Sequence, residues 1–238
     1  MFAALLFHCG IMCLFEYGQY FNPFFTLCIG PGLRSMDSAQ NTYQLLSGTI
    51  DDLDGYGCWC YFDEDVGRGQ GTPVNKIDAR CRNLHHGYAC ARLDDSSNNV
   101  CQRPWEVSYT HVDLNNYLNT LTLSYEDVHI ECETKNAGDD CKSRACAVES
   151  YFILNLVTLA LTPNTFDYSF SHAENVWDPT ANCLPMDLDS SEKECCGDYP
   201  LRFPFKTKNG ERGCCKDVTY DTNMHNCCAG DVLSLAIC

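Results

Sequence analysis

Cysteine thiols are the most abundant groups in this chain that could do chemistry, and disulfide bonding is the chemistry that they fit best. The sequence has 19 cysteines in 238 residues, a density typical of disulfide frameworks in oxidising compartments. A zinc cluster needs paired ligands at regular spacing, and no CxxC with a matching partner pair occurs. A cysteine nucleophile needs a free thiol, which an oxidised chain does not offer. The cysteine content therefore predicts a secreted, extracellular protein.

The cysteines fall into three groups along the chain. Cys9, Cys13 and Cys28 form an odd group, so at least one thiol stays free or pairs with another group or another chain. These three are candidates for intermolecular bonds. The other two groups have even membership and can close internally. Our disulfide candidates in them are Cys58, Cys60, Cys81, Cys90, Cys101, Cys132, Cys141 and Cys146, then Cys183, Cys195, Cys196, Cys214, Cys215, Cys227, Cys228 and Cys238.

Carboxylates and imidazoles offer two further candidate metal sites. Asp63, Glu64 and Asp65 could hold calcium, which prefers carboxylate oxygens, although an acidic turn facing solvent is the favoured interpretation. His85 and His86 are adjacent, and neighbouring helical side chains diverge by about 100 degrees, so they do not easily share an ion. We expect no cofactor, with calcium as the alternative.

The charge of the chain restricts its partners. Thirty-two acidic side chains face 16 basic ones, giving a formal net charge of −16. Such a surface repels nucleic acid and anionic bilayers. We expect no nucleic-acid partner.

Three segments have the periodicity of helices. Apolar side chains recur at helical spacing between Ser38 and Asp54 and again around Cys81. A third helix is expected from Asp140 through Ala160. Its late part is apolar on nearly all sides, which indicates burial in a core rather than a membrane span.

Composition divides the chain into four parts. Residues 1–35 are apolar and read as a signal peptide or as an assembly arm that stays in the mature protein. Residues 36–162 form the expected helical domain, and residues 163–182 carry turn formers typical of a linker. Residues 183–238 form a small cysteine-rich module.

Residues 38–160 resemble the secreted phospholipase A2 family. In that family a YGCxC stretch opens a glycine-rich loop whose backbone carbonyls bind calcium, and a helix reading D-x-C-C-x-x-H-D-x-C-Y follows. The matching residues here are Tyr56, Gly57, Cys58, Cys60, Gly67, Gly69, Gly71, Pro73, Val74, Asp78, Cys81 and Tyr88. The resemblance implies a mainly α fold with irregular loops.

The resemblance also implies that catalytic groups of the family have been replaced. Leu84 stands where the family has its catalytic histidine, and His85 stands where it has its calcium aspartate. Glu149 takes the place of the aspartate that orients the histidine. Leucine cannot accept a proton and a neutral imidazole is a poor calcium ligand, so this register implies an inactive site. A shift by one residue makes His85 the base and Glu149 its partner, yet His86 then replaces the calcium carboxylate.

One family disulfide is missing at both of its ends in this register. Gly87 takes the place of one cysteine on the first long helix, and Val148 takes the place of the other on the second. The joint loss supports the gapless register.

The C-terminal module resembles the di-cysteine repeats of galaxin-like extracellular matrix proteins. Its paired cysteines are Cys195–Cys196, Cys214–Cys215 and Cys227–Cys228. Adjacent cysteines rarely bond each other without strain, so each pair is expected to staple two separate segments to a third. The expectation is a small, stiff, loop-rich or β module.

These observations favour a secreted, non-catalytic phospholipase A2-like protein that serves as a structural or binding subunit of an extracellular filament or matrix, associating with itself or with other matrix proteins. The alternatives are a calcium-dependent phospholipase A2 using His85 and Glu149, and a protein that binds lipid without hydrolysing it.

Overall fold

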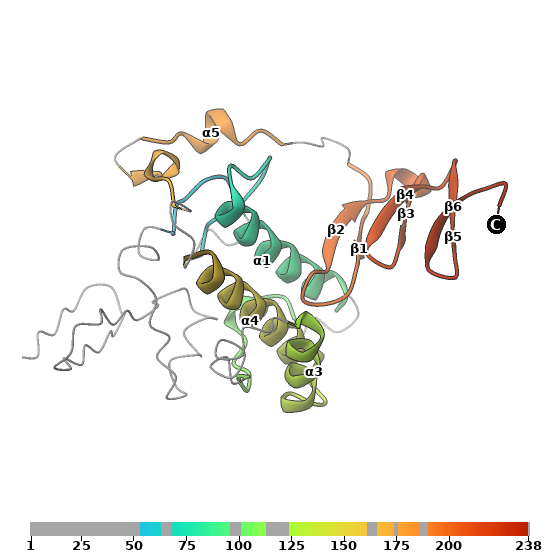
Figure 1. Cartoon of the computed structure of the whole chain (residues 1–238), viewed down its shortest axis with the longest axis horizontal. Coiled ribbons are helices and arrows are strands. Elements are labelled where there is room, and N and C mark those ends of the chain that lie inside the picture. Colours follow the sequence, from blue (N-terminus) through green and yellow to red (C-terminus); the bar gives the residue numbers. More distant parts are fainter. Residues whose placement is uncertain are drawn as a thin grey trace, which may run out of the picture.

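The computed structural model describes residues 53–62, 68–95, 101–112, 124–160, 166–173, 176–185 and 190–237 (Figure 1). Helices come first along the described chain and strands follow. The helices are α1 (Lys76–Leu93), α3 (Tyr125–Lys135), α4 (Asp140–Ala160) and α5 (Pro179–Asn182), with 3-10 turns η2 (Pro104–Glu106), η3 (Tyr168–Phe170) and η5 (Lys208–Gly210). The strands are β1 (Lys193–Cys196), β2 (Phe203–Lys206), β3 (Arg212–Cys215), β4 (Val218–Asp221), β5 (His225–Cys228) and β6 (Asp231–Ser234).

The structure confirms a disulfide-rich protein with helices and a small module of antiparallel strand pairs. The helix around Cys81 is confirmed as α1, and α4 has the bounds expected from the sequence. Helix α3 was not predicted. It buries only Val128 and Cys132, too narrow an apolar face to stand out by periodicity. The helix expected between Ser38 and Asp54 lies almost wholly outside the described residues.

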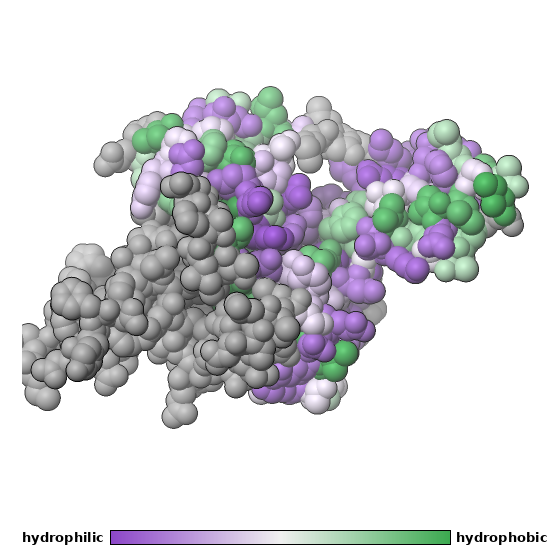
Figure 2. All heavy atoms as spheres, in the orientation of Figure 1, coloured by the Kyte–Doolittle hydropathy of each residue, from purple (hydrophilic) through white to green (hydrophobic). Residues whose placement is uncertain are grey.

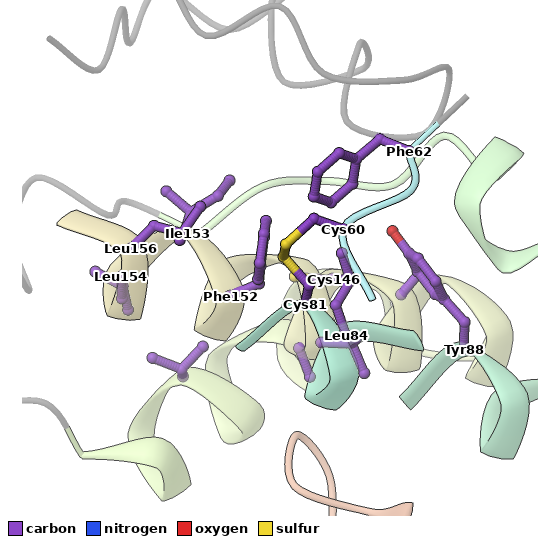
Figure 3. Packing of buried hydrophobic residues seen from close by; sticks show 14 of the residues in the cluster. Cys60, Phe62, Cys81, Leu84, Tyr88, Cys146, Phe152, Ile153, Leu154 and Leu156 are labelled. Carbon is purple, nitrogen blue, oxygen red and sulfur yellow. A yellow bond between two sulfur atoms is a disulfide. The ribbon is translucent and has the colours of Figure 1, made fainter. Parts of the chain in front are cut away.

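Helices α1 and α4 pack side by side and antiparallel (Figure 1). Helix α1 begins where the Asn75 side chain accepts a hydrogen bond from the Asp78 backbone N–H, which satisfies one free donor of the first turn. In α4 the run from Tyr151 to Leu156 is buried, as its all-round apolarity predicts. Figure 3 shows Phe152 and Phe62 beside the Cys60–Cys81 disulfide, with Leu84 nearby.

The strands form three separate two-stranded hairpins. They pair as β1–β2, β3–β4 and β5–β6, each antiparallel. The β3–β4 turn has Lys216 at φ 54°, and the β5–β6 turn has Ala229 at φ 54° and Gly230 at φ 90°, the left-handed conformation that tight hairpin turns require. The hairpins follow one another away from the helices (Figure 1).

Seven disulfide bonds join described cysteines. They are Cys58–Cys183, Cys60–Cys81, Cys90–Cys195, Cys101–Cys141, Cys132–Cys146, Cys196–Cys214 and Cys215–Cys227. Cys228 is also disulfide-bonded, whereas Cys9, Cys13, Cys28 and Cys238 lie outside the described residues. This abundance is consistent with a secreted protein. Among the described helices, none is long and apolar enough to cross a membrane.

The two even cysteine groups do not close separately, so that expectation was wrong. Cys58–Cys183 and Cys90–Cys195 both connect the middle group to the C-terminal group. The segment expected to be a linker also packs onto the helical body. The Phe170 carbonyl accepts a hydrogen bond from the Gly57 N–H, and the Phe166 ring stacks on Tyr56 with ring centroids 4.6 Å apart. The order of residues along the chain does not by itself predict these disulfides and contacts between distant segments.

Candidate functional site

A buried carboxyl group, Glu149 of α4, lies at the centre of the site that the sequence singles out. Its side chain has no solvent exposure. Its Oε1 accepts a hydrogen bond of 2.8 Å from the Tyr88 hydroxyl, and its Oε2 accepts one of 2.6 Å from the Tyr109 hydroxyl. Tyr88 comes from α1 and Tyr109 from the irregular segment before α3, so the site joins three parts of the chain.

Burial changes the ionisation of this cluster. Loss of solvent raises the pKa of Glu149 from 4.5 to about 8, although both phenol donors oppose the shift. Burial and the neighbouring carboxylate also raise the pKa values of Tyr88 and Tyr109 well above 10. At neutral pH the carboxyl group is therefore largely protonated, and it holds little of the negative charge that would stabilise a catalytic imidazolium.

The histidine proposed as an alternative base does not reach Glu149. His85 is 5% exposed, and neither of its ring nitrogens has a hydrogen-bond partner among the described residues. Its ring stacks at 6.4 Å from that of Phe62. Burial lowers the pKa of His85 to about 4, with a smaller opposing effect from the Trp59 backbone. The structure thus holds a neutral imidazole that makes no hydrogen bond to the carboxyl group.

Leu84, which stands at the catalytic position in the gapless register, is a core residue. It is 2% exposed and belongs to the main apolar cluster (Figure 3). His86 is the next residue after His85, and its ring meets that of Trp59 edge-on at 5.2 Å. Burial also lowers the pKa of His86 to about 4. The two adjacent histidines are thus neutral groups against aromatic rings at physiological pH.

Asp78 fixes the start of the loop onto α1. This carboxylate has no solvent exposure and accepts three backbone hydrogen bonds: from Cys58 at 2.9 Å, from Trp59 at 2.7 Å and from Val74 at 2.9 Å. A Cβ added to Gly57 would lie 2.5 Å from the Asp78 Cγ, so the backbone approach requires glycine there. The residue was matched from the sequence, but its role as a buried acceptor was not predicted.

Gly87 and Val148 face each other across the α1–α4 contact. A Cβ added to Gly87 would lie 2.6 Å from Val148 Cγ2 and 3.2 Å from its Cβ. The absence of a side chain at Gly87 therefore lets the two helices approach closely at this level.

The candidate calcium ligands Asp63 and Asp65 lie outside the described residues. Within the described part of the chain, no group of three or more His, Cys, Asp or Glu side chains could hold a metal ion. Tyr109 is the residue of this cluster that sequence reasoning missed, because it lies in an irregular segment without a motif.

A cleft of about 350 Å³ lies where α3, α4 and the first hairpin meet. On one wall Asp94 accepts hydrogen bonds from Arg202 Nε at 2.8 Å, from Arg202 Nη2 at 3.1 Å and from the Tyr199 hydroxyl at 2.9 Å. Arg144 lies over the Tyr199 ring, 5.9 Å from its centroid. These contacts fasten the hairpin module to the helical body.

No protein-family model matches this chain, and no solved structure matches it.

Proposed function

We propose that this protein is a secreted, non-catalytic member of the phospholipase A2-like class with a galaxin-like C-terminal module, and that it serves as a structural subunit of an extracellular filament or matrix. The observation that carries the proposal is the environment of Glu149. Its two oxygens bind tyrosine hydroxyls instead of a histidine, and a buried leucine stands at the position of the base. A scaffold without this chemistry is suited to building or binding rather than to turnover.

The contact between Gly87 and Val148 supports the proposed relationship. The resemblance assigns these two positions to one family disulfide, and they lie opposite each other here. The pairing of Tyr88 with Glu149 one residue further along both helices agrees with the same register. These two adjacent contacts agree with the gapless alignment on which Leu84 replaces the base.

Replacing Gly87 and Val148 together with cysteine is expected to create an additional disulfide. The Cβ separation of 3.2 Å is a few tenths of an ångström below the range of about 3.5–4.5 Å in disulfides, so the helices need move only slightly. The bond should stabilise the protein by about 2–4 kcal/mol. Mass spectrometry without reduction measures the bond, and thermal unfolding measures its effect.

The matched control is Gly87→Ala alone. Its methyl group meets Val148 without gaining a bond, and overpacking should destabilise the protein by about 1–3 kcal/mol. Two thiols that stay reduced in the double variant would count against the gapless register.

The function itself is tested by lipolysis and by assembly, measured on the same purified protein. We expect no release of fatty acid from phospholipid vesicles at millimolar calcium, because no base faces Glu149. We expect self-association in electron micrographs and intermolecular bonds on non-reducing gels. Calcium-dependent fatty-acid release that is lost in His85→Gln would establish the enzyme instead. A uniform monomer without repeating contacts would exclude the structural role.

A further inference from the structure

In the first two cysteine pairs of the hairpin module, one cysteine bonds to an earlier segment of the chain and its neighbour bonds to a later one. In the first cysteine pair, Cys195 bonds backward to Cys90 of α1 while Cys196 bonds forward to Cys214. In the second pair, Cys214 completes that bond and Cys215 bonds forward to Cys227. Each of these two pairs therefore receives one link from the preceding element and sends one to the next. The result is a continuous covalent path from α1 to the last hairpin.

This path is much shorter than the polypeptide that it bypasses. The Cα atoms joined by its three disulfides are 5.8, 5.5 and 5.4 Å apart. With one peptide step inside each cysteine pair, the path from Cys90 to Cys228 spans at most about 28 Å. The chain from Cys195 to Cys228 would span about 110 Å when extended. Tension applied along the path leaves the hairpin loops unloaded.

The hairpins have little else to hold them together. From Lys208 to Ile237 the one buried side chain is Cys215. Val218, Met224, Leu235 and Ile237 remain exposed, and apolar surface is visible among polar side chains on this module (Figure 2). An isolated two-stranded hairpin is marginal in water. The compactness of this module therefore depends on its disulfide bonds, because its side chains bury too little surface to form a hydrophobic core.

The covalent path joins the helical part of the protein at Cys90, where side-chain contacts also hold the first hairpin. Cys90 lies in the last turn of α1, which packs along α4. Four residues later, Asp94 is held by Arg202 and Tyr199 from the first hairpin. A second bond, Cys58–Cys183, fixes the connecting segment on its other side. Both ends of the connection between body and hairpins are thereby closed, so the connecting chain carries no load.

From this geometry we infer that the C-terminal hairpins form a tension-bearing tether, in which force applied beyond Cys228 passes through the disulfides into α1. This function deepens the structural role proposed above and rests on it, because a subunit under tension needs a link that does not lengthen. The load-bearing residues are Cys90, Cys195 and the paired cysteines that follow.

Single-molecule pulling on the full chain tests the tether. One handle is attached without thiol chemistry at Arg92, exposed at the end of α1, and the other at Ala236. We call the Cys196–Cys214 bond the first rung and the Cys215–Cys227 bond the second rung. Removing the first rung by Cys196→Ser together with Cys214→Ser should lengthen the stretched oxidised molecule by about 55 Å, because 18 residues enter the load path. Removing the second rung as Cys215→Ser with Cys227→Ser should add about 35 Å, because that rung closes 12 residues.

The matched control is Cys132→Ser with Cys146→Ser, which removes a bond between α3 and α4 outside this path. It should leave the stretched length unchanged. Reducing the wild-type protein while it is held under force provides the same two length steps if a rung variant does not fold, together with a third, much longer step from Cys90–Cys195, which closes 105 residues. Rung variants with the wild-type length, or a wild-type molecule that lengthens by tens of ångströms while oxidised, would overturn the tether. A protein that stays monomeric would overturn the proposed assembly but not these length steps.

Discussion

Replacing Asp78 with asparagine is expected to lower the free energy of unfolding by about 1–3 kcal/mol, the range for leaving a buried hydrogen-bond donor without its acceptor. The carboxylate accepts backbone hydrogen bonds from Cys58, Trp59 and Val74. An amide presents its own N–H₂ donors to these N–H groups, so at least one buried donor loses its acceptor and costs about 1–3 kcal/mol. Thermal unfolding of the oxidised protein measures the loss.

The effect should concentrate at the loop that Asp78 anchors. Amide hydrogen exchange at Cys58 and Trp59 should accelerate, while exchange in the hairpins should not. Asp127→Asn is the matched control, since Asp127 also lies in the first turn of a helix but is exposed. That change should cost under about 1 kcal/mol. An Asp78→Asn protein as stable as the control would show that the three hydrogen bonds contribute little.

Replacing Glu149 with glutamine is expected to remove a pH dependence of stability. The folded pKa of Glu149 is about 8, against 4.5 for the ordinary group. Because the folded value is raised, its contribution is fully present below about pH 4.5 and is lost as the pH rises through 8. In that window the wild-type protein should lose up to about 1.4 kcal/mol of stability per pH unit.

The titration of two histidines lowers stability as the pH falls, which is opposite to the effect of Glu149. The pH range of the measurement must therefore lie above their titration. The pKa values of His85 and His86 are lowered from 6.5 to about 4. Their contribution is present above pH 6.5 and is lost as the pH falls through 4. Between about pH 7 and 8 the unfolded histidines are already largely neutral, so Glu149 sets most of the slope among these three. Urea unfolding at pH 7, 7.5 and 8 measures it.

Glutamine preserves the size of the side chain and stays neutral. The Glu149→Gln protein should therefore give a nearly flat profile in this window and be the more stable of the two at pH 8. Glu149→Ala is the control for packing. It leaves a cavity and two buried phenols without an acceptor, and should destabilise by about 3–5 kcal/mol at every pH. A wild-type profile as flat as that of the glutamine variant would contradict the raised pKa.

The sequence was most informative where periodicity or a fixed local motif determines structure. The bounds of α4 follow from a long apolar run, and α1 follows from its cysteine-bearing face. The cysteine pairs predicted that neighbours bond to different segments, and the bonds of Cys195 and Cys196 confirm this. Each of these features depends on residues close together along the chain.

Features that depend on long-range contacts could not be predicted. Eight cysteines allow 105 pairings, and nothing local selects Cys58 for a partner 125 residues away. The same holds for the site. Glu149 was singled out from its motif, but its second partner, Tyr109, comes from a segment without regular structure. The packing of Phe166 and Phe170 against Tyr56 also requires the folded body to exist first.

The long bond between Cys58 and Cys183 has a consequence for the order of oxidation during biosynthesis. Chain growth runs from the N-terminus, so the Cys58 thiol must wait for 125 further residues before its partner exists. During that time Cys60 can close with Cys81 after only 21 residues. The hairpin rungs, closing 18 and 12 residues, are local and come last. Because Cys183 precedes all of the hairpin cysteines, the bond that closes the helical body onto the connecting segment can form before any rung of the tether exists.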